Sequence, residues 1–486
     1  MFRLLFNSAE FLLFFPIVVL VYFVLPHRIK WVWLLVTSYY FYMCWNPTYS
    51  LLIATSTVIT YLSGLLIEKH HQHKKLWVAL SFTSNLAILF FFKYYHFAAS
   101  NLNALLGAMN VRSALPSFDI LLPVGISFYT FQALGYTVDV YRRKISAQKN
   151  LFKYALFISF FPQLVAGPIE RSGNLMKQLD ERHSFDWDQV RQGLLIMLWG
   201  FVEKVVIADR AAIIVNQVYQ HPERYGSLAL ILATLAFALQ IYCDFSGYSR
   251  IAIGAAHVMG FRLMENFRQP YFATSISDFW RRWHISLSTW FKDYLYIPLG
   301  GNRCSRLKKY RNLLTTFLVS GLWHGASWNF VIWGALHGVF QIVGDFTAPY
   351  RKKLLSLFHV NQETFVHRLW QRLITFALVC FGWIFFRASH VSDAFAIIGG
   401  IFGSNQFGGL DALGLNMANI IVLLLCVVLL FAVSLMRDRG IRPLYWLLTQ
   451  KLPLRWAICL GLIFLLLIFG VYGEHYDASS FIYFQF

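Results

Sequence analysis

The sequence has few charged residues and lacks the signatures of several common enzyme classes. Only 13% of its 486 residues are Asp, Glu, Lys or Arg, whereas a soluble protein has about 25%. We find no GxSxG nucleophile elbow, no Walker A phosphate-binding loop and no HExxH zinc motif. No polar stretch is long enough to form a soluble domain. These absences argue against a serine hydrolase of that type and an ATP-driven pump, and they indicate an integral membrane protein.

Cysteine is sparse, and its spacing excludes two common uses of thiols. The six cysteines are scattered singly: Cys44, Cys243, Cys304, Cys380, Cys426 and Cys459. Because neither a zinc-binding spacing nor a disulfide framework is present, we expect buried, unreactive thiols and no metal site. The histidines between Lys69 and Lys75 are interpreted as part of a solvated basic loop rather than as metal ligands.

Hydrophobic residues make up 58% of the chain and form long runs. Runs of about 20 residues without strict alternation predict transmembrane helices rather than a barrel. The candidate spans are 9–26, 31–46, 49–67, 76–96, 119–140, 151–168, 190–215, 227–243, 311–325, 327–346, 370–386, 417–436 and 455–473. We therefore expect an all-α polytopic protein with about 11–13 transmembrane or re-entrant helices.

Positive charge is abundant, but its distribution argues against nucleic-acid binding. The formal net charge is +19, and the basic residues lie mainly in short loops between apolar runs. This is the positive-inside pattern of a cytoplasmic membrane protein. Basic loops at 27–30, 69–75 and 142–144 follow the first, third and fifth spans. We expect these loops in the cytoplasm and the N-terminus outside.

The C-terminal half predicts the same orientation. Residues 351–353 and 437–442 are expected inside, and the Gly-rich loop 403–416 and the tail after Gly473 are expected outside. The first apolar run has no small-residue cleavage site, which indicates a retained span rather than a signal peptide. Both termini are therefore predicted on the extracytoplasmic side.

The stretch SGLWHGASW places His324 near the end of a largely apolar run. If its helix begins near Arg311, His324 lies about 20 Å from the cytoplasmic face, well inside a hydrocarbon core of about 30 Å. Gly321 and Gly325 remove bulk around the imidazole, so another backbone or a substrate can come close. A lone histidine in such a run is often a packed residue, but an unobstructed imidazole suits a general base.

A second motif, SISDFWRRWHISLSTWFKDYLYIPLGGNR at residues 275–303, predicts an amphipathic helix. Ser277 or Asp278 is the expected N-cap of a helix that starts at Phe279. One face is polar and the opposite face is apolar. The polar face carries Arg281, His284 and Ser288, and the apolar stripe carries Phe279, Trp283, Leu287 and Trp290.

The same motif supplies positive charge. Arg281, Arg282 and Lys292 either grip the phosphates of a ligand or snorkel to lipid headgroups, and the sequence leaves both open. The loop from Gly300 to Arg311 adds basic residues on the expected cytoplasmic side. A polyanionic ligand that enters from the cytoplasm would meet this charge first.

Other polar positions are weaker candidates. Asp244 and Arg250, in YCDFSGYSR, are interpreted as a structural ion pair. His337 is interpreted as a packing residue. Gln163, in FPQLVAGPIER, belongs to a polar break near the end of a span and could line a cavity.

Together these motifs resemble the membrane-bound O-acyltransferase superfamily. The resemblance rests on DFWRRWHISLSTWFKDYLYIPLGGNR, GLWHGASWNFVIWGALHG and FGWIFFRA, with LLPVGISFYTFQALGYTVDVYR, FFPQLVAGPIER and IYCDFSGYSRIAIG upstream. It is closest to the bacterial branch that includes the alginate O-acetylation membrane proteins. It implies one transmembrane domain, a ring of helices with a central tunnel. Peripheral helices are expected in 1–115, the core at about 119–390 and C-terminal helices at about 415–475.

The resemblance also implies roles for individual residues. The histidine of the family's WHG motif is taken as catalytic and corresponds to His324, the implied general base. The histidine of RWHISLS corresponds to His284, which is expected to orient substrate. The candidates for substrate or donor binding are Arg281, Arg282, Trp283, Ser288, Trp290, Lys292, Trp323, Asp244 and Gln163.

The implied reaction moves an acetyl group across the bacterial inner membrane. The donor is expected to be a cytoplasmic thioester, acetyl-coenzyme A, and the acceptor a hydroxyl of an extracytoplasmic partner or polysaccharide. The resemblance implies a separately encoded SGNH-type acetylesterase-like partner and an exopolysaccharide or cell-wall glycan. We expect no bound cofactor and no metal.

Two alternatives stay open. Within the same family, the protein could transfer D-alanine to teichoic acid from a carrier-protein thioester. In a different class, it could be a proton-coupled transporter with His324 and His284 in a relay. The polar residues cluster in one block from Asp244 to His337, and we see no paired broken helices, which favours the transferase.

Overall fold

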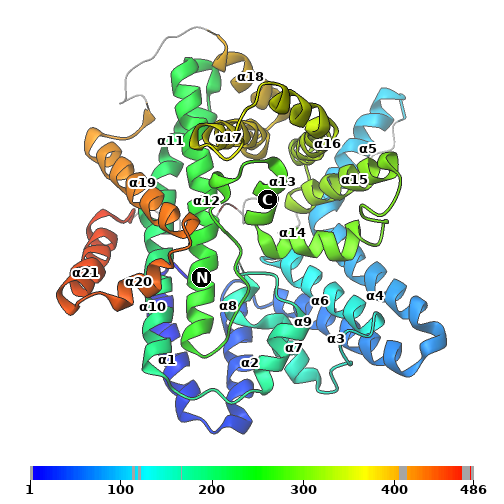
Figure 1. Cartoon of the computed structure of the whole chain (residues 1–486). Coiled ribbons are helices and arrows are strands. Elements are labelled where there is room, and N and C mark those ends of the chain that lie inside the picture. Colours follow the sequence, from blue (N-terminus) through cyan, green and yellow to red (C-terminus); the bar gives the residue numbers. More distant parts are fainter. Residues whose placement is uncertain are drawn as a thin grey trace. The chain divides into compact units, whose positions relative to one another are not determined.

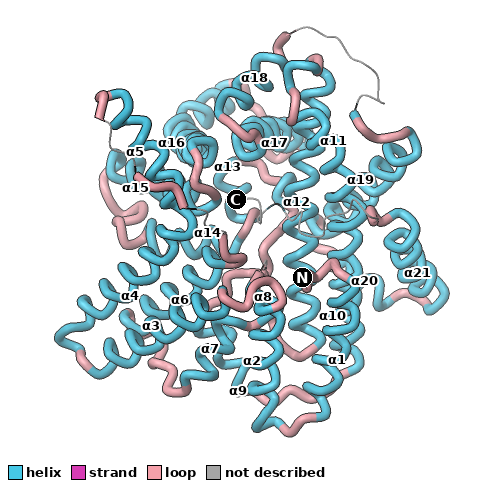
Figure 2. Tube along the Cα trace, turned by 180° about the vertical axis from the view of Figure 1, so that it is seen from behind, coloured by secondary structure: helices cyan, strands magenta, loops and turns pink. Residues whose placement is uncertain are grey.

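A computed structural model describes residues 4–111, 115–118, 122–165, 167–403, 413–472 and 482. These residues form helices and connecting loops, and none of them forms a strand (Figures 1 and 2). Seven helices in the described part are long and apolar enough to cross a membrane. The predicted all-α, multi-pass class is therefore confirmed.

The helices group into two compact units, Met1–Leu194 with Ile251–Met264, and Leu195–Arg250 with Glu265–Gln485. The first unit holds α1 (Ala9–Val24), α2 (His27–Met43), α3 (Tyr49–Lys69), η1 (His71–His73), α4 (Lys74–Leu89), η2 (Phe90–Tyr94), α5 (Tyr95–Ala108), α6 (Ile126–Tyr141), α7 (Leu151–Ser159), α8 (Phe161–Leu164) and α9 (Ser172–Asp180). Both units include parts of α10 (Trp187–Phe201) and α12 (Ser227–Val258). The predicted division into peripheral, core and C-terminal helices stays a prediction.

The second unit contains the two histidine motifs. Its other elements are η3 (Val202–Ala208), α11 (Asp209–Tyr219), η4 (Pro222–Arg224), η5 (Pro270–Phe272), α13 (Ile276–Arg282), α14 (Ile285–Phe291), η6 (Lys292–Tyr296), α15 (Arg306–His324), α16 (Trp328–Leu357), α17 (Phe365–Arg387), α18 (Val391–Ile401), α19 (Met417–Asp438), α20 (Pro443–Thr449) and α21 (Leu452–Phe469).

Several predicted spans and loops differ from the observed helices in their bounds. The predicted span 151–168 is two helices, α7 and α8, because Phe160 has a non-helical backbone with ψ 109° just before Pro162 enters the first turn of α8. The predicted loop 97–118 contains most of α5, and α18 was not anticipated. The predicted outer loop 403–416 and the tail after Gly473 fall largely outside the described residues.

Small polar residues hold the first unit together. The buried face of α3 carries Ser56, Thr60 and Gly64, with α4 and α6 beside it (Figures 1 and 2). Ser56 donates to Asn85 of α4 at 2.5 Å, and Tyr154 of α7 donates to Thr60 at 2.8 Å. Small residues allow close helix approach inside a membrane, where apolar burial drives association only weakly.

Two glycines bring α15 and α16 of the second unit into backbone contact. A Cβ on Gly321 would collide with the carbonyl oxygen of Phe330, and one on Gly334 would collide with that of Phe317. Of the two glycines that flank the WHG histidine, Gly321 therefore makes room for protein backbone, which is one of the two uses that the sequence leaves open, whereas Gly325 makes room for the side chain of Phe330. This contact places His324 at the end of α15 against α16.

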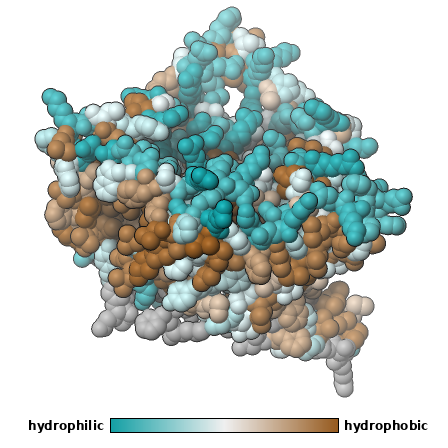
Figure 3. Space-filling model, turned by 90° about the horizontal axis from the view of Figure 1, so that it is seen from below, coloured by the Kyte–Doolittle hydropathy of each residue, from teal (hydrophilic) through white to brown (hydrophobic). Residues whose placement is uncertain are grey.

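The outer faces of several helices are apolar. On α19, exposed residues include Leu424, Leu425 and Val428, and on α21 no residue is buried. Figure 3 shows hydrophobic residues (brown) gathered beside hydrophilic ones (teal) on one face of the molecule. The exposed apolar faces of α19 and α21 suit contact with lipid chains.

The glycine contact can be tested by comparing two positions on α16. We expect Gly334→Ala to destabilise the protein by about 1–3 kcal/mol, because its methyl group meets the Phe317 carbonyl. At Gly344 an added Cβ meets nothing within 4 Å, so Gly344→Ala should leave stability unchanged or raise it. Thermal unfolding in detergent measures both; equal unfolding temperatures for the two variants would contradict the backbone contact.

Candidate active site

His284 lies in a sharp turn between two short helices. α13 ends at Arg282 and α14 begins at Ile285, and His284 has a left-handed backbone with φ 41°. This conformation costs a non-glycine residue about 1–2 kcal/mol, so helices rarely continue through it. The predicted single helix that starts at Phe279 is therefore wrong.

The start of the motif also differs from the prediction. The N-cap of α13 is Ser275, whose hydroxyl oxygen accepts from the Asp278 N–H at 3.1 Å. Ser277 and Asp278, the predicted caps, lie within the first turn. Ser275 and Asp278, three residues apart, have the pattern of a capping box. This pattern indicates a helix that starts at Ile276, where the structure places it.

A neighbouring segment fixes the turn that contains His284. The Ile285 N–H donates to the Asn266 carbonyl at 2.9 Å, and the Ser286 N–H donates to the Asn266 side chain at 3.3 Å. Asn266 in turn donates to Ser249 of α12 at 3.1 Å. The left-handed conformation is thus held by bonds to the residues that follow His284, and no sequence pattern indicated this role for Asn266.

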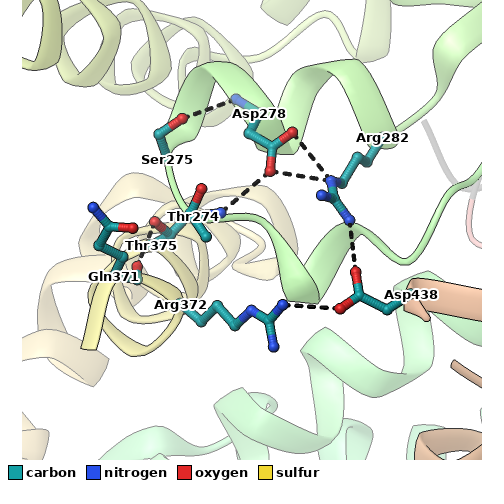
Figure 4. Close-up of polar contacts among 8 residues, drawn as sticks. All are labelled: Thr274, Ser275, Asp278, Arg282, Gln371, Arg372, Thr375 and Asp438. Carbon is teal, nitrogen blue, oxygen red and sulfur yellow. Dashed lines mark hydrogen bonds and ion pairs between the residues drawn. The ribbon is translucent and has the colours of Figure 1, made fainter. Parts of the chain in front are cut away.

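An ion-pair network anchors α13 to two other helices (Figure 4). Arg282 lies 3.1 Å from Asp278 of the same helix and 3.5 Å from Asp438 at the end of α19. Asp438 also pairs with Arg372 of α17 at 2.9 Å. Arg282, predicted to bind ligand, is therefore engaged by two carboxylates and holds α13 in place.

His324 is the last residue of α15, and aromatic rings surround its side chain. The helix begins at Arg306 rather than near Arg311, so His324 lies about 27 Å along the helix axis from its start. The His324 ring centroid is 5.0 Å from that of Trp333 and 5.4 Å from that of Phe386. Only 3% of the residue is exposed.

Trp323 contacts both His284 and His324, which we call the signature histidines. Its ring centroid lies 6.0 Å from His284 and 5.0 Å from His324. His284 also contacts Phe245 of α12, with ring centroids 4.6 Å apart. Because burial lowers the pKa of His284 to about 3, its imidazole is neutral at physiological pH.

A third histidine, His337, contacts the same Trp333 indole ring as His324. His337 of α16 is fully buried, and its Nδ1 accepts a hydrogen bond from the Trp280 indole at 3.2 Å. Its ring centroid is 5.0 Å from that of Trp333, whose indole also contacts His324. The interpretation of His337 as a packing residue is confirmed, with the addition that it fixes Trp280.

A cavity of about 1530 Å³ is lined by residues of α13, α14, α15, α16 and α17. Ser320, one helical turn before His324, lines it, and so does Ser288, one turn after His284. Trp280 and Phe317 form part of its apolar wall. Its basic lining residues are Arg281, Lys292, Arg303, Lys309 and Arg351.

The cavity gathers positive charge near the two histidines, although its lining includes neither His284 nor His324. Of the predicted ligand-binding residues, it is lined by Arg281, Ser288 and Lys292. Its acidic member, Asp345, pairs with Lys309 at 2.7 Å. The remaining basic side chains make the cavity suitable for a ligand with several negative charges.

Comparison with known proteins identifies the family. Residues 38–391 match the membrane-bound O-acyltransferase (MBOAT) family. The chain belongs to this family.

Relatives of this chain include proteins named for three different activities. A "probable alginate O-acetylase" of Azotobacter vinelandii is 39% identical over 444 residues, covering 90% of this chain and 85% of the relative. A "peptidoglycan O-acetyltransferase" of Helicobacter pylori is 36% identical, covering 83% and 81% of the two chains. A "teichoic acid D-alanyltransferase" of Bacillus subtilis is 29% identical, covering 56% and 70%.

Membership of the MBOAT family confirms an O-acyltransferase and disfavours the transporter alternative. The residues of the WHG and RWHISLS motifs, His324 and His284, lie in one unit with the basic cavity.

The predicted pair of Asp244 and Arg250 is wrong in this MBOAT protein. Asp244 instead lies 2.7 Å from Lys204, and Arg250 lies 3.2 Å from Glu203. Residues six apart on α12 point to different sides of the helix, and each meets one of two consecutive residues of η3. With their charges paired in this way, Asp244 and Arg250 lie within α12, which continues to Val258 past the predicted span end at residue 243.

The other predicted ligand-binding residues have structural contacts. Trp283 is buried and lies 5.0 Å from Trp383 between ring centroids. Trp290 packs against Tyr294 with ring centroids 5.0 Å apart. Gln163, in the first unit, donates to the Phe157 carbonyl at 2.7 Å. No contact with a ligand is assigned to any of the three.

The left-handed turn at His284 predicts a difference between two substitutions. Asparagine tolerates this backbone conformation, whereas β-branched valine does not. We expect His284→Val to be less stable than His284→Asn by about 1–2 kcal/mol, measured as thermal unfolding in detergent. Equal stabilities would show that the turn relaxes without strain.

Proposed function

We propose that this MBOAT enzyme transfers an acetyl group from acetyl-coenzyme A to a hydroxyl, with His324 as general base. The acceptor oxygen attacks the thioester carbonyl as its proton passes to a nitrogen of His324. The carbon–oxygen bond forms, the carbon–sulfur bond breaks, and the coenzyme A thiolate takes up the proton. A positioned base of this kind contributes about 10²–10⁴ in rate.

The observation that carries the proposal is the basic cavity whose lining includes Ser320 and Ser288, each one helical turn from a signature histidine. A volume of about 1530 Å³ exceeds the range of roughly 300–1,000 Å³ typical of small-ligand pockets, so a nucleotide with a long arm has room. Arg281, Lys292 and Arg303 would bind its phosphates. The pantetheine arm would then extend along Ser288 and Ser320 toward His324.

The surroundings of His324 suit a base that acts on a hydroxyl. Trp323, Trp333 and Phe386 exclude water from the imidazole, which protects the thioester from hydrolysis. His284, neutral and rigidly held, would orient the acceptor or the carbonyl oxygen by a hydrogen bond. The acyl donor is a substrate in this scheme, and the chain's own residues perform the proton transfer.

The relatives suggest an envelope polysaccharide as the final acceptor. The alginate and peptidoglycan relatives are 39% and 36% identical and match more than four-fifths of this chain, whereas the teichoic-acid relative is 29% identical and matches 56%. These shares favour O-acetylation over D-alanylation. We further propose donor entry from the cytoplasm and transfer outside the inner membrane, directly or through an SGNH-type partner.

The proton-transfer role can be tested with His324→Ala in proteoliposomes. We expect release of coenzyme A from labelled acetyl-coenzyme A to fall by at least about 10²-fold, with unchanged membrane insertion. His73→Ala, a substitution at an exposed histidine of η1 that does not line the cavity, serves as the control and should retain activity. Activity like the wild type in a well-folded His324→Ala protein would exclude His324 as the base.

The donor-binding role can be tested with two lysines outside the proton-transfer site. We expect Lys292→Gln to raise the KM for acetyl-coenzyme A several-fold with little change in kcat, because Lys292 lines the cavity. Lys308→Gln removes the same charge from a residue that does not line it. If both substitutions raise KM equally, the effect is general attraction rather than binding in the cavity.

A further inference from the structure

A second basic cavity lies in the first unit, apart from the histidine motifs. Its volume is about 430 Å³, and it opens where α3 ends, α4 begins and α6 ends. It is lined by Ile67, Glu68, His71, Lys74, Val140, Tyr141, Arg143, Lys144, Ile145 and Ser146. Three of these residues, Lys74, Arg143 and Lys144, are permanent cations, and one, Glu68, is an acid.

The position of this cavity places it at the edge of the membrane. Tyr49–Lys69 is a candidate membrane span, and the next candidate span begins at His71. Residues 69–75 are therefore at the end of two spans, where lipid headgroups meet water. A charged cavity at this level is within reach of a lipid phosphate.

The cations have few carboxylate partners inside the protein. Lys144 lies 3.9 Å from Asp139, which is a loose contact for an ion pair, and the Lys74 ammonium lies 5.0 Å from the Tyr141 ring centroid. Among the described residues, Arg143 and Lys74 form no salt bridge. The cavity therefore keeps a positive charge that a bound anion would neutralise.

Arg143 has a backbone that glycine normally provides. It follows the end of α6 with φ 58°, and the Lys144 N–H closes the turn by donating to the Asp139 carbonyl at 2.9 Å. In such helix-ending turns the left-handed position usually holds glycine, since other residues are strained there. The strained residue, Arg143, is therefore also one of the cations that line the cavity.

We infer that this cavity binds the phosphate group of an anionic phospholipid. Lys74 at the start of α4 and Arg143 just after α6 contact the phosphate, and the hydroxyls of Tyr141 and Ser146 offer further hydrogen bonds. Binding would join the α3–α4 connection to the end of α6. The inference does not depend on the proposed acyl transfer.

The test is binding of dioleoyl phosphatidylglycerol to the full-length protein in detergent, measured by native mass spectrometry. We expect the Lys74→Gln/Arg143→Gln variant to bind at least about tenfold more weakly than the wild type. The matched control is Lys75→Gln/Arg142→Gln, which removes equal charge from adjacent residues that do not line the cavity. Its affinity should change less than about twofold.

A second variant separates binding from folding. Arg143→Gly relieves the left-handed strain while it removes the charge, so it should unfold at the same or a higher temperature and still bind more weakly. If the Lys74→Gln/Arg143→Gln variant and its control bind the lipid equally weakly, the inference is overturned, because the lipid then responds to overall charge and not to the cavity. Unchanged binding in Arg143→Gly would also overturn it.

Competition identifies the source of the phosphate. If inorganic phosphate displaces phosphatidylglycerol from the wild type, the cavity recognises the phosphate group alone. If only the lipid binds, its glycerol and acyl chains also contribute. Zwitterionic phosphatidylcholine should bind no better to the wild type than to the double variant, and tight, charge-independent binding of that lipid would contradict the inference.

Discussion

The backbone contact between α15 and α16 is the constraint on which the site depends. Gly321 and Gly334 allow two helices to approach until each carbonyl lies where a side chain would otherwise stand. His324 ends α15 beside this contact, and Trp333 of α16 packs against its ring at 5.0 Å. A buried imidazole costs free energy unless neighbouring groups of the protein compensate for the lost water. The close approach of α16 brings the Trp333 ring against the imidazole and so provides part of these surroundings.

A second constraint acts on the other histidine. His284 has a strained backbone, and the bonds to Asn266 together with the ion pairs of Arg282 hold that backbone in place. Strain of this kind persists only where neighbouring structure determines it, and such positions often occur at functional sites. The two histidines are thus positioned by different means, and Trp323 contacts both.

The sequence predicted the class of protein and the residues that gather at the site, but not the way the residues are held. Hydrophobic runs located most helices because transfer into lipid depends on composition. The break at His284 was missed because periodicity continues across it, and only the backbone of that residue reveals it. The ion pairs of α12 were misassigned because Glu203 and Lys204 are distant in sequence from Asp244 and Arg250. Long-range pairing leaves no periodic signal in a single chain.

The central claim is that a thioester carbonyl reaches His324 through the basic cavity. The most direct measurement is a structure of the protein with a non-hydrolysable acetyl-coenzyme A analogue. We expect phosphates beside Arg281 and Lys292, with the carbonyl carbon near enough for a hydroxyl held between it and His324 to attack at about 3–3.5 Å. An analogue bound with its carbonyl away from His324, or outside the cavity altogether, would contradict it.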